Sequence, residues 1–180
     1  KTIREQIDKG GPPYPISVNQ SRMHLNDPLY INRITEMLSR YQIPKGYIEL
    51  EITETVFFTE REKMISILNE LKEVEVQLSM DDFGSGYSSL NMLKDFPFDV
   101  LKIDKEFFSE SITSESSKWI LRMIIEMAEG LGIRVICEGV ETKEQVEMLR
   151  KLGCRYVQGY YYSKPIPAEN YVESFCGEIA

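Results

Sequence analysis

The feature that most constrains the fold is a regular alternation of short apolar runs with longer amphipathic stretches. Runs of four to seven apolar or β-branched residues are typical of strands, whereas apolar residues three and four positions apart are typical of helices. Six strand–helix units follow one another without a linker or a change in composition. The predicted strands are residues 15–19, 47–52, 76–80, 100–103, 133–137 and 155–157. Units of this kind join parallel strands through helical crossovers.

The predicted helices follow these strands in turn. They cover residues 29–41, 60–74, 88–94, 115–131, 143–152 and 168–175. Asp27-Pro28 is a start signal for the first helix, and Gly132 and Gly153 are stop signals for two later ones.

Two parallel architectures fit this order, an open doubly wound sheet and a closed (β/α)₈ barrel. A typical barrel needs about 250 residues, and six units in 180 residues fall two units short. Length alone therefore favours the open sheet. The polar residues at the carboxyl ends of the strands, described next, favour the barrel. The prediction is an α/β fold, a TIM-type (β/α) barrel that is incomplete, with about six of the eight units. Residues 1–180 form a single domain in this interpretation.

Each predicted strand carries a polar side chain at or near its carboxyl end. In chain order these are Asn19, Glu51 with Glu54, Asp81-Asp82, Lys102 with Asp104, Glu138 with Glu141, and Gln158. A barrel brings all these ends to one face, where active sites lie. An open sheet spreads them along an edge.

Strands also end in polar residues simply because they reach the surface, and that alternative suffices for Asn19 or Gln158 taken alone. It explains the whole set less well, because Glu51 and Lys102 lie between apolar residues and Glu138 follows an apolar run. A charge among apolar neighbours is costly unless it is paired or bound to a metal ion.

Binding of hard divalent cations is the chemistry that these residues suit. Asn, Asp and Glu offer oxygen ligands, which suit Mg²⁺, Mn²⁺ or Ca²⁺, and no His/Cys cluster exists for zinc. Adjacent Asp81 and Asp82 are able to serve two ions. Two ions about 3.5–4 Å apart clamp a phosphoryl centre and generate hydroxide near neutral pH. Lys102 would stabilise phosphoryl charge or orient the attacking water.

Composition limits the partners and the compartment. A net charge of −8 argues against a nucleic-acid polymer and against contact with an anionic membrane, whereas bound cations would reverse the field locally. Three widely spaced cysteines indicate reduced thiols in a cytoplasmic protein. No apolar run is long enough to span a bilayer, so any membrane anchor of a longer parent protein is expected outside this segment.

Six blocks of the sequence resemble, in order, the signature blocks of the EAL domain. They are Val18-Asn19-Gln20-Ser21, Leu50-Glu51-Ile52-Thr53-Glu54, the run from Asp81 to Leu90, Leu101-Lys102-Ile103-Asp104-Lys105, Glu138-Gly139-Val140-Glu141-Thr142 and Gln158-Gly159-Tyr160-Tyr161. The family comprises bacterial phosphodiesterases that hydrolyse cyclic di-GMP to linear pGpG. The resemblance therefore implies cyclic di-GMP as substrate and two Mg²⁺ or Mn²⁺ ions as cofactors.

The resemblance also implies a role for each site residue. Asn19, Glu51 and Asp81 match ligands of the first ion, and Asp82 matches a ligand of the second ion or its waters. Lys102 matches the lysine near the attacking water, Glu138 the general base or a partner of the second ion, and Gln158 a residue that holds a water. Glu54 matches the glutamate that anchors the loop containing Ser85 and Gly86, and Asp104 and Glu141 are expected to support the ligands.

The sequence departs from the family in one important respect, because the Glu-Ala-Leu motif is absent. In the family that motif lies on an early strand, its Glu binds the first ion, and an Arg soon after it binds substrate phosphate. We therefore expect the chain to be the later part of a barrel whose first units are missing, and to be nearly inactive alone. Ser85 stands for the usual Thr, and Cys137 for the usual Ala.

Open barrel edges seek partners, so self-association or a homodimer is expected. Upstream sensory or diguanylate cyclase domains are further expected partners. The main alternative function is a non-catalytic EAL-type receptor or scaffold for cyclic di-GMP, and an unrelated metal-dependent barrel enzyme is a third. The retained ligands favour the enzyme.

Overall fold

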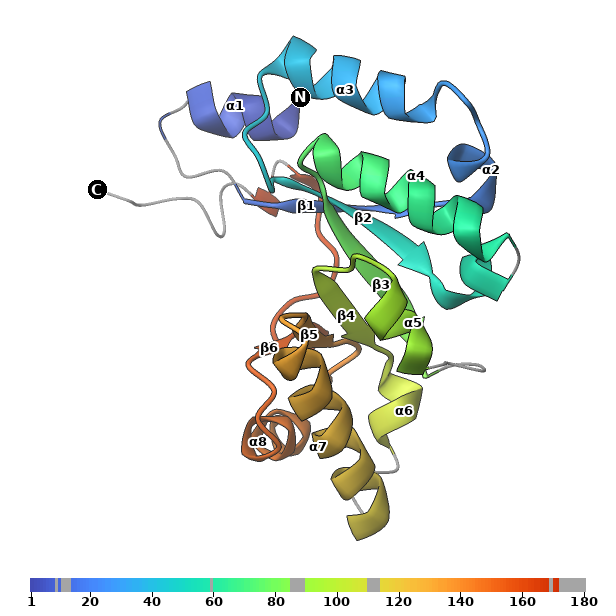
Figure 1. Cartoon of the computed structure of the whole chain (residues 1–180). Coiled ribbons are helices and arrows are strands. Elements are labelled where there is room, and N and C mark those ends of the chain that lie inside the picture. The colour runs from blue at the N-terminus through green and yellow to red at the C-terminus, as the bar shows by residue number, and fades with distance from the viewer. Residues whose placement is uncertain are drawn as a thin grey trace.

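Six parallel strands form one sheet in the computed structural model, which describes residues 1–8, 10, 14–58, 60–84, 90–109, 114–168 and 170–171. The strands lie side by side in chain order (Figure 1). They are β1 (Ile16–Gln20), β2 (Ile48–Thr53), β3 (Gln77–Phe83), β4 (Val100–Ile103), β5 (Arg134–Cys137) and β6 (Tyr156–Val157). Each predicted strand is present, and the predicted bounds of β4 are those of the structure.

The strand order decides between the two architectures. A doubly wound sheet reverses its order at a switch point, whereas here each crossover leads to the next strand in the same direction. Right-handed crossovers that all run one way place their helices on one face of the sheet, as in a barrel wall. The incomplete barrel is therefore confirmed, and the open doubly wound alternative is wrong.

Helices of very different length precede and connect the strands. They are α1 (Thr2–Asp8), α2 (Arg22–Leu25), α3 (Tyr30–Tyr41), the 3₁₀ helix η1 (Glu54–Phe58), α4 (Arg61–Glu73), α5 (Leu90–Asp95), α6 (Lys105–Ser109), α7 (Glu115–Gly130) and α8 (Lys143–Lys151). The predictions for α3, α4, α7 and α8 are correct to within one residue at each end. Most of the predicted helix 168–175 lies outside the described residues, as do residues 88 and 89 of the helix predicted at 88–94.

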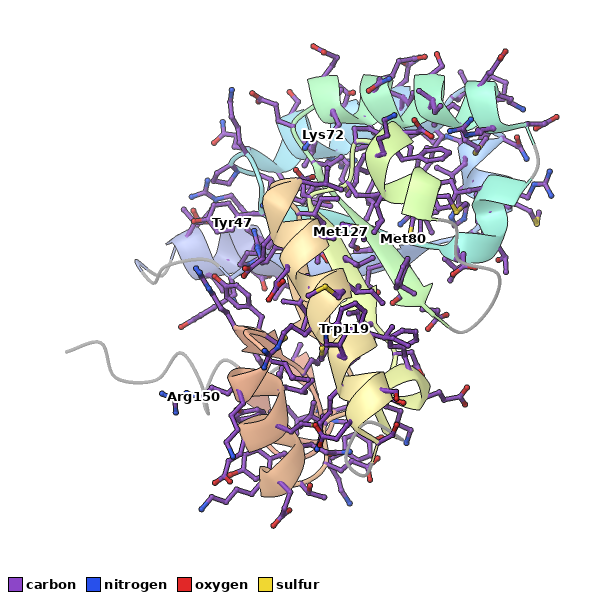
Figure 2. All side chains as sticks on the ribbon, turned by 60° about the horizontal axis from the view of Figure 1, so that its bottom comes forward. Tyr47, Lys72, Met80, Trp119, Met127 and Arg150 are labelled. Atoms are coloured by element: carbon purple, nitrogen blue, oxygen red, sulfur yellow. The ribbon has the colours of Figure 1, made fainter. Side chains whose placement is uncertain are left out.

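The core lies between the sheet and the helices. Leu50 and Ile52 on β2 are buried on the helix side, as are Leu78 and Met80 on β3. The helices contribute further buried apolar residues, which include Leu68, Leu71, Leu121 and Ile125. Trp119 on α7, by contrast, is 63% exposed (Figure 2). Because side chains alternate along a strand, the residues between these core positions face the concave side of the sheet.

None of the helices in the described residues is both long and apolar enough to cross a membrane.

Candidate functional site

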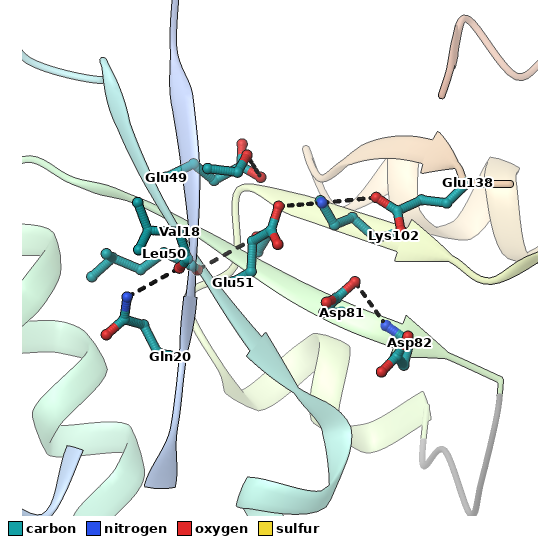
Figure 3. Close-up of polar contacts among 11 residues, drawn as sticks. Val18, Gln20, Glu49, Leu50, Glu51, Asp81, Asp82, Lys102 and Glu138 are labelled. Carbon is teal, nitrogen blue, oxygen red and sulfur yellow. Dashed lines mark hydrogen bonds and ion pairs between the residues drawn. The ribbon is translucent and has the colours of Figure 1, made fainter. Parts of the chain in front are cut away.

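A buried lysine stands at the centre of the concave face. The side chain of Lys102 on β4 is only 5% exposed, and its ammonium forms ion pairs with two carboxylates, those of Glu51 on β2 and Glu138 just after β5. The distance from Nζ to Oε1 of Glu138 is 2.8 Å. Figure 3 shows the three side chains in a row across the sheet. Buried charges persist only when they are paired in this way.

Strand register explains why these residues meet. Lys102 pairs in register with Ile136 on β5, so Glu138 lies two residues further on and on the same face as Lys102. Asn19 on β1 pairs in register with Glu51 on β2. Parallel strands in matched register thus bring their carboxyl ends to one rim, which is the geometry that makes barrel rims suitable for sites.

Asp81 and Asp82 reach this rim through a β-bulge. The predicted strand ends at residue 80, but β3 continues to Phe83 and therefore includes both aspartates. Met80 pairs with Leu101 and Phe83 with Ile103, so β3 has one residue more than β4 between these pairs. A bulge leaves this extra residue unpaired and increases the local twist, which re-aims side chains. Asp82 has φ 56°, a left-handed conformation that Asp tolerates better than most residues.

The site carries an excess of negative charge. Burial raises the pKa of Asp81 to about 6, and the charge of Glu138 adds to the shift while Lys102 opposes it. Burial alone would lower the pKa of Lys102, but the hydrogen bonds and charges of Glu138 and Glu51 raise that pKa above its ordinary value. Lys102 is therefore held in its charged form, whereas the surroundings of Asp81 disfavour its charge.

The donor set is the one that hard divalent cations prefer. Glu51, Asp81, Asp82 and Glu138 offer only oxygen atoms, and one ammonium does not balance four carboxylates. Oε1 of Glu138 is buried and lies 2.8 Å from Nζ of Lys102, and a carboxylate oxygen in one such contact keeps acceptor capacity for another donor. Within the described ranges, however, no three acidic, His or Cys side chains converge as a ready metal site. The oxygen donors are therefore of the kind that binds a divalent cation, but two of them, on Glu51 and Glu138, are paired with Lys102.

A tight crossing of two loops fixes the far side of the site. The amide of Val140 donates to the carbonyl of Gln158, and the amide of Tyr161 donates to the carbonyl of Val140, both at 3.0 Å. Gly159 lies between these contacts, and a Cβ there would fall 2.1 Å from the Val140 carbonyl oxygen. The glycine lets the loop after β6 lie directly on the loop after β5, which carries Glu138. Sequence reasoning missed this role, because a close backbone approach has no local sequence signal.

The other predicted residues have varied surroundings. Asn19 and Gln158 are exposed at the rim, whereas Glu54 is buried at the start of η1. Asp104 accepts a 2.7 Å hydrogen bond from the amide of Glu106 at the start of α6, and exposed Glu141 pairs with Lys105 at 3.1 Å. Ser85 and Gly86 lie outside the described residues.

Glu49 is a buried carboxylate that sequence reasoning also missed. It is 5% exposed and accepts a 3.3 Å hydrogen bond from Ser17 on β1. Its signal was available, because Glu49 and Glu51 are two residues apart on one strand and so share a face. Figure 3 places Glu49 beside Glu51 on the concave side.

Comparison with known proteins identifies relatives along nearly the whole chain. The profile of the EAL domain matches residues 1–165. The signaling protein YkoW of Bacillus subtilis is 39% identical over 173 residues, which is 95% of this chain and 21% of YkoW. The bifunctional diguanylate cyclase/cyclic di-GMP phosphodiesterase MucR of Pseudomonas aeruginosa is 33% identical over 174 residues, 97% of this chain and 25% of MucR. The chain thus spans a quarter or less of the length of either relative.

Solved structures agree with these matches. The crystal structure of the EAL domain of Mycobacterium smegmatis DcpA has a TM-score of 0.91 and 31% identity, over 99% of this chain and 81% of the DcpA chain. The complex of the MucR phosphodiesterase with cyclic di-GMP has a TM-score of 0.85 and 33% identity, over 94% of this chain and 68% of that one.

Proposed function

The chain belongs to the EAL domain family, and from this premise we propose that it forms part of a metal-dependent phosphodiesterase that hydrolyses cyclic di-GMP to linear pGpG. The observation that carries the proposal is the buried ammonium of Lys102, which is paired with Glu51 and Glu138 and lies close enough to Asp81 to act on its pKa. MucR is named a cyclic di-GMP phosphodiesterase as well as a diguanylate cyclase, and its phosphodiesterase structure is a complex with cyclic di-GMP, which supports the choice of substrate.

The carboxylates have the role of holding cations. Asn19, Glu51 and Asp81 would hold the first Mg²⁺ or Mn²⁺ ion, and Asp82 the second or its waters. When bound, the two ions would generate a nucleophilic hydroxide and neutralise charge on the phosphodiester. Cation binding requires the charged form of Asp81, whose pKa of about 6 lets it ionise near neutral pH.

Lys102 and Glu138 have complementary roles toward the water and the phosphate. The raised pKa of Lys102 keeps it protonated, so it does not act as a base. Its ammonium instead donates to the attacking water or to a phosphoryl oxygen. Glu138, with acceptor capacity left at Oε1, takes the proton of the attacking water, and Gln158 at the rim holds a water in place.

One observation favours the receptor alternative. Lys102 already engages Glu51 and Glu138, and the described residues hold no ready group of three metal-ligating acidic, His or Cys side chains. A domain in this state would bind cyclic di-GMP without cleaving it. The enzyme is favoured by the expected metal ligands that Lys102 does not pair with, namely Asn19, Asp81 and Asp82.

Turnover measured together with binding distinguishes the two functions. The longest natural form of the protein is incubated with cyclic di-GMP and Mg²⁺ or Mn²⁺, pGpG is quantified by chromatography, and affinity is measured by calorimetry in Ca²⁺. The enzyme predicts pGpG formation that Asp81→Asn and Lys102→Ala abolish, whereas Lys105→Ala on the exposed rim retains it. Tight binding without any pGpG would establish the receptor instead.

The isolated 180 residues are proposed to be nearly inactive. The sequence contains no Glu-Ala-Leu tripeptide, and the resemblance assigns its Glu to the first ion. Mg²⁺ binds weakly when a carboxylate ligand is missing. A longer form that includes such a segment is expected to turn over at least ten-fold faster, as an order-of-magnitude estimate from lost ion occupancy. Equal rates for both forms would refute this.

Self-association and coupling to other domains complete the proposal. In the described part of the chain β1 pairs only with β2, and Val18 on β1 is 42% exposed. An open edge recruits partners, and a lysine there opposes pairing. Light scattering should therefore show concentration-dependent association that Val18→Lys weakens. Sensory or diguanylate cyclase domains are proposed neighbours, and the buried free thiols of Cys137 and Cys154 support a cytoplasmic location.

A further inference from the structure

Two buried thiols lie in contact just outside the carboxylate cluster. Cys137 is the last residue of β5, and Cys154 lies in the turn before β6. Their Sγ atoms are 3.6 Å apart, and the residues are 0% and 6% exposed. Cys154 Sγ also lies 3.1 Å from the carbonyl oxygen of Tyr156, so the pair is held in a defined place.

Both cysteines belong to segments that lead into the site. Glu138 directly follows Cys137, and the carbonyl of Cys137 accepts a 2.9 Å hydrogen bond from the amide of Gln158. Cys137 packs in the core on the helix side of β5. Because successive side chains on a strand point to opposite faces, a movement of Cys137 toward the helices draws Glu138 away from the concave face.

We propose that Cys137 and Cys154 form a redox modification site, which a hydroperoxide converts to an intramolecular disulfide and a thiol reductant restores. A disulfide has an S–S length of about 2.05 Å, so the sulfurs need to approach by only about 1.5 Å. Neither sulfur has to leave the interior for this. Transient disulfides of this kind in reducing compartments are typically regulatory.

The reaction with hydrogen peroxide is balanced without another reactant. Cys154, the more exposed of the two, loses its proton to solvent, and its thiolate attacks one peroxide oxygen. The O–O bond breaks, giving a sulfenic acid on Cys154 and a hydroxide that takes up a proton to become water. The Cys137 sulfur then attacks the sulfenic sulfur, its proton leaves with the hydroxyl group as a second water, and the S–S bond forms. Two thiols are oxidised by two electrons, and one peroxide is reduced to two waters.

The disulfide is proposed to slow the chemistry of the neighbouring site, and this part rests on the proposed phosphodiesterase function. Approach of the sulfurs moves Cys137 outward and lengthens the 2.8 Å contact between Lys102 and Glu138. A displacement of about 1 Å in a catalytic group lowers a rate by up to 100-fold, so we expect a loss of about ten-fold.

Peptide mapping tests the disulfide without reference to activity. The folded protein is treated with hydrogen peroxide, denatured in an alkylating reagent and digested with trypsin. The proposal predicts a cross-link between peptides 135–143 and 152–155, which contain one cysteine each. The cross-link should persist in Cys176→Ser and disappear in Cys154→Ser, in Cys137→Ala and after dithiothreitol. Thermal unfolding of the reduced variants verifies that each is folded. Separately alkylated or over-oxidised Cys137 and Cys154, or cross-links that require Cys176, would overturn the proposal.

Turnover of cyclic di-GMP tests the coupling. Oxidised Cys176→Ser protein is expected to hydrolyse about ten-fold more slowly than the reduced form, whereas oxidised Cys137→Ala keeps its reduced rate. A complete cross-link with an unchanged rate would overturn the coupling alone. These rates are measured on the longest natural form of the protein, because the isolated 180 residues are proposed to be nearly inactive. Absence of turnover by that form in both redox states contradicts the proposed function, while the peptide map still decides the disulfide.

Discussion

The ammonium nitrogen of Lys102 lies 2.8 Å from the carboxylate of Glu138, across the buried boundary between β4 and β5. The same ammonium pairs with Glu51 on β2, so one cation ties together three segments of the barrel wall. This sharing makes the stability of the fold and the chemistry of the site depend on the same side chain.

Replacement of that cation should destabilise the protein strongly. Lys102→Met keeps most of the aliphatic volume but leaves Glu51 and Glu138 buried without their partner. Breaking a buried pair in this way costs about 3–5 kcal/mol. Chemical denaturation measures the change. The double variant Lys102→Met/Glu51→Gln should recover part of the loss, because it removes one uncompensated charge.

Lys105→Met is the matched control for this prediction. Lys105 forms a comparable ion pair with Glu141, but both side chains are about half exposed. Its denaturation midpoint should match that of the wild type, since exposed pairs contribute little. Equal midpoints for the Lys102 and Lys105 variants would contradict the central place given to Lys102.

The stability of the metal-free protein should depend on the charge of Asp81. Its pKa rises from 3.8 to about 6 on folding, so the protonated form is favoured in the folded state. The stability linked to Asp81 is therefore fully present below pH 3.8 and is lost as the pH rises through 6. Asp81→Asn should match the wild type near pH 4 and exceed it in EDTA above pH 7 by on the order of 2 kcal/mol. A difference that stays constant across this range would count against the assignment.

The loop crossing at Gly159 should not tolerate a side chain. In Gly159→Ala the new Cβ would meet backbone atoms of Val140, the nearest at 2.1 Å, so the two loops must separate. We expect a lower melting temperature and a reduced turnover, because Glu138 and Gln158 lie on these loops. Gly130→Ala at the end of α7 is the control, since its Cβ meets nothing within 4 Å. Similar melting temperatures for the two variants would show that the crossing is not constrained.

The backbone of Asp82 provides a separate test of the bulge. Because φ is 56° at this position, Asp82→Gly should be more stable than Asp82→Ala by about 1 kcal/mol. Both variants remove the same carboxylate, so the difference reports the backbone alone. Calorimetric melting curves of the two metal-free variants measure it, and an alanine variant as stable as the glycine variant would mean that the bulge relaxes in solution.

The elements of the fold that could be predicted are those whose sequence has a repeating pattern of apolar residues. Strands and the four long helices have apolar periodicity, which the sequence displays directly. Three of the four missed helices, α2, η1 and α6, are too short to show a period. The fourth, α1, buries only Ile3 and Gln6 and so has no apolar stripe. The choice of barrel over open sheet depended on polar strand ends, because strand order is a property of the folded chain.

The site was predictable as a set of residue types at strand ends. Its inner geometry was not, because it depends on long-range contacts. The bulge that re-aims Asp81 and Asp82 arises from the pairing of β3 with β4, and the role of Gly159 from its contact with Val140. The double ion pair of Lys102 likewise joins residues on two strands and one just after a third, which no local pattern reveals. The roles of the individual site residues remain predictions.

The most direct test of the central claim is the formation of pGpG from cyclic di-GMP with Mn²⁺ or Mg²⁺, in the longest natural form of the protein. If Lys102 and its carboxylates form a hydrolytic site, pGpG should accumulate when the cation is added and its formation should stop in EDTA. Lys102→Ala should abolish pGpG formation, whereas Lys105→Ala should not. Cation-independent turnover, or turnover that survives Lys102→Ala in a folded variant, would contradict the account.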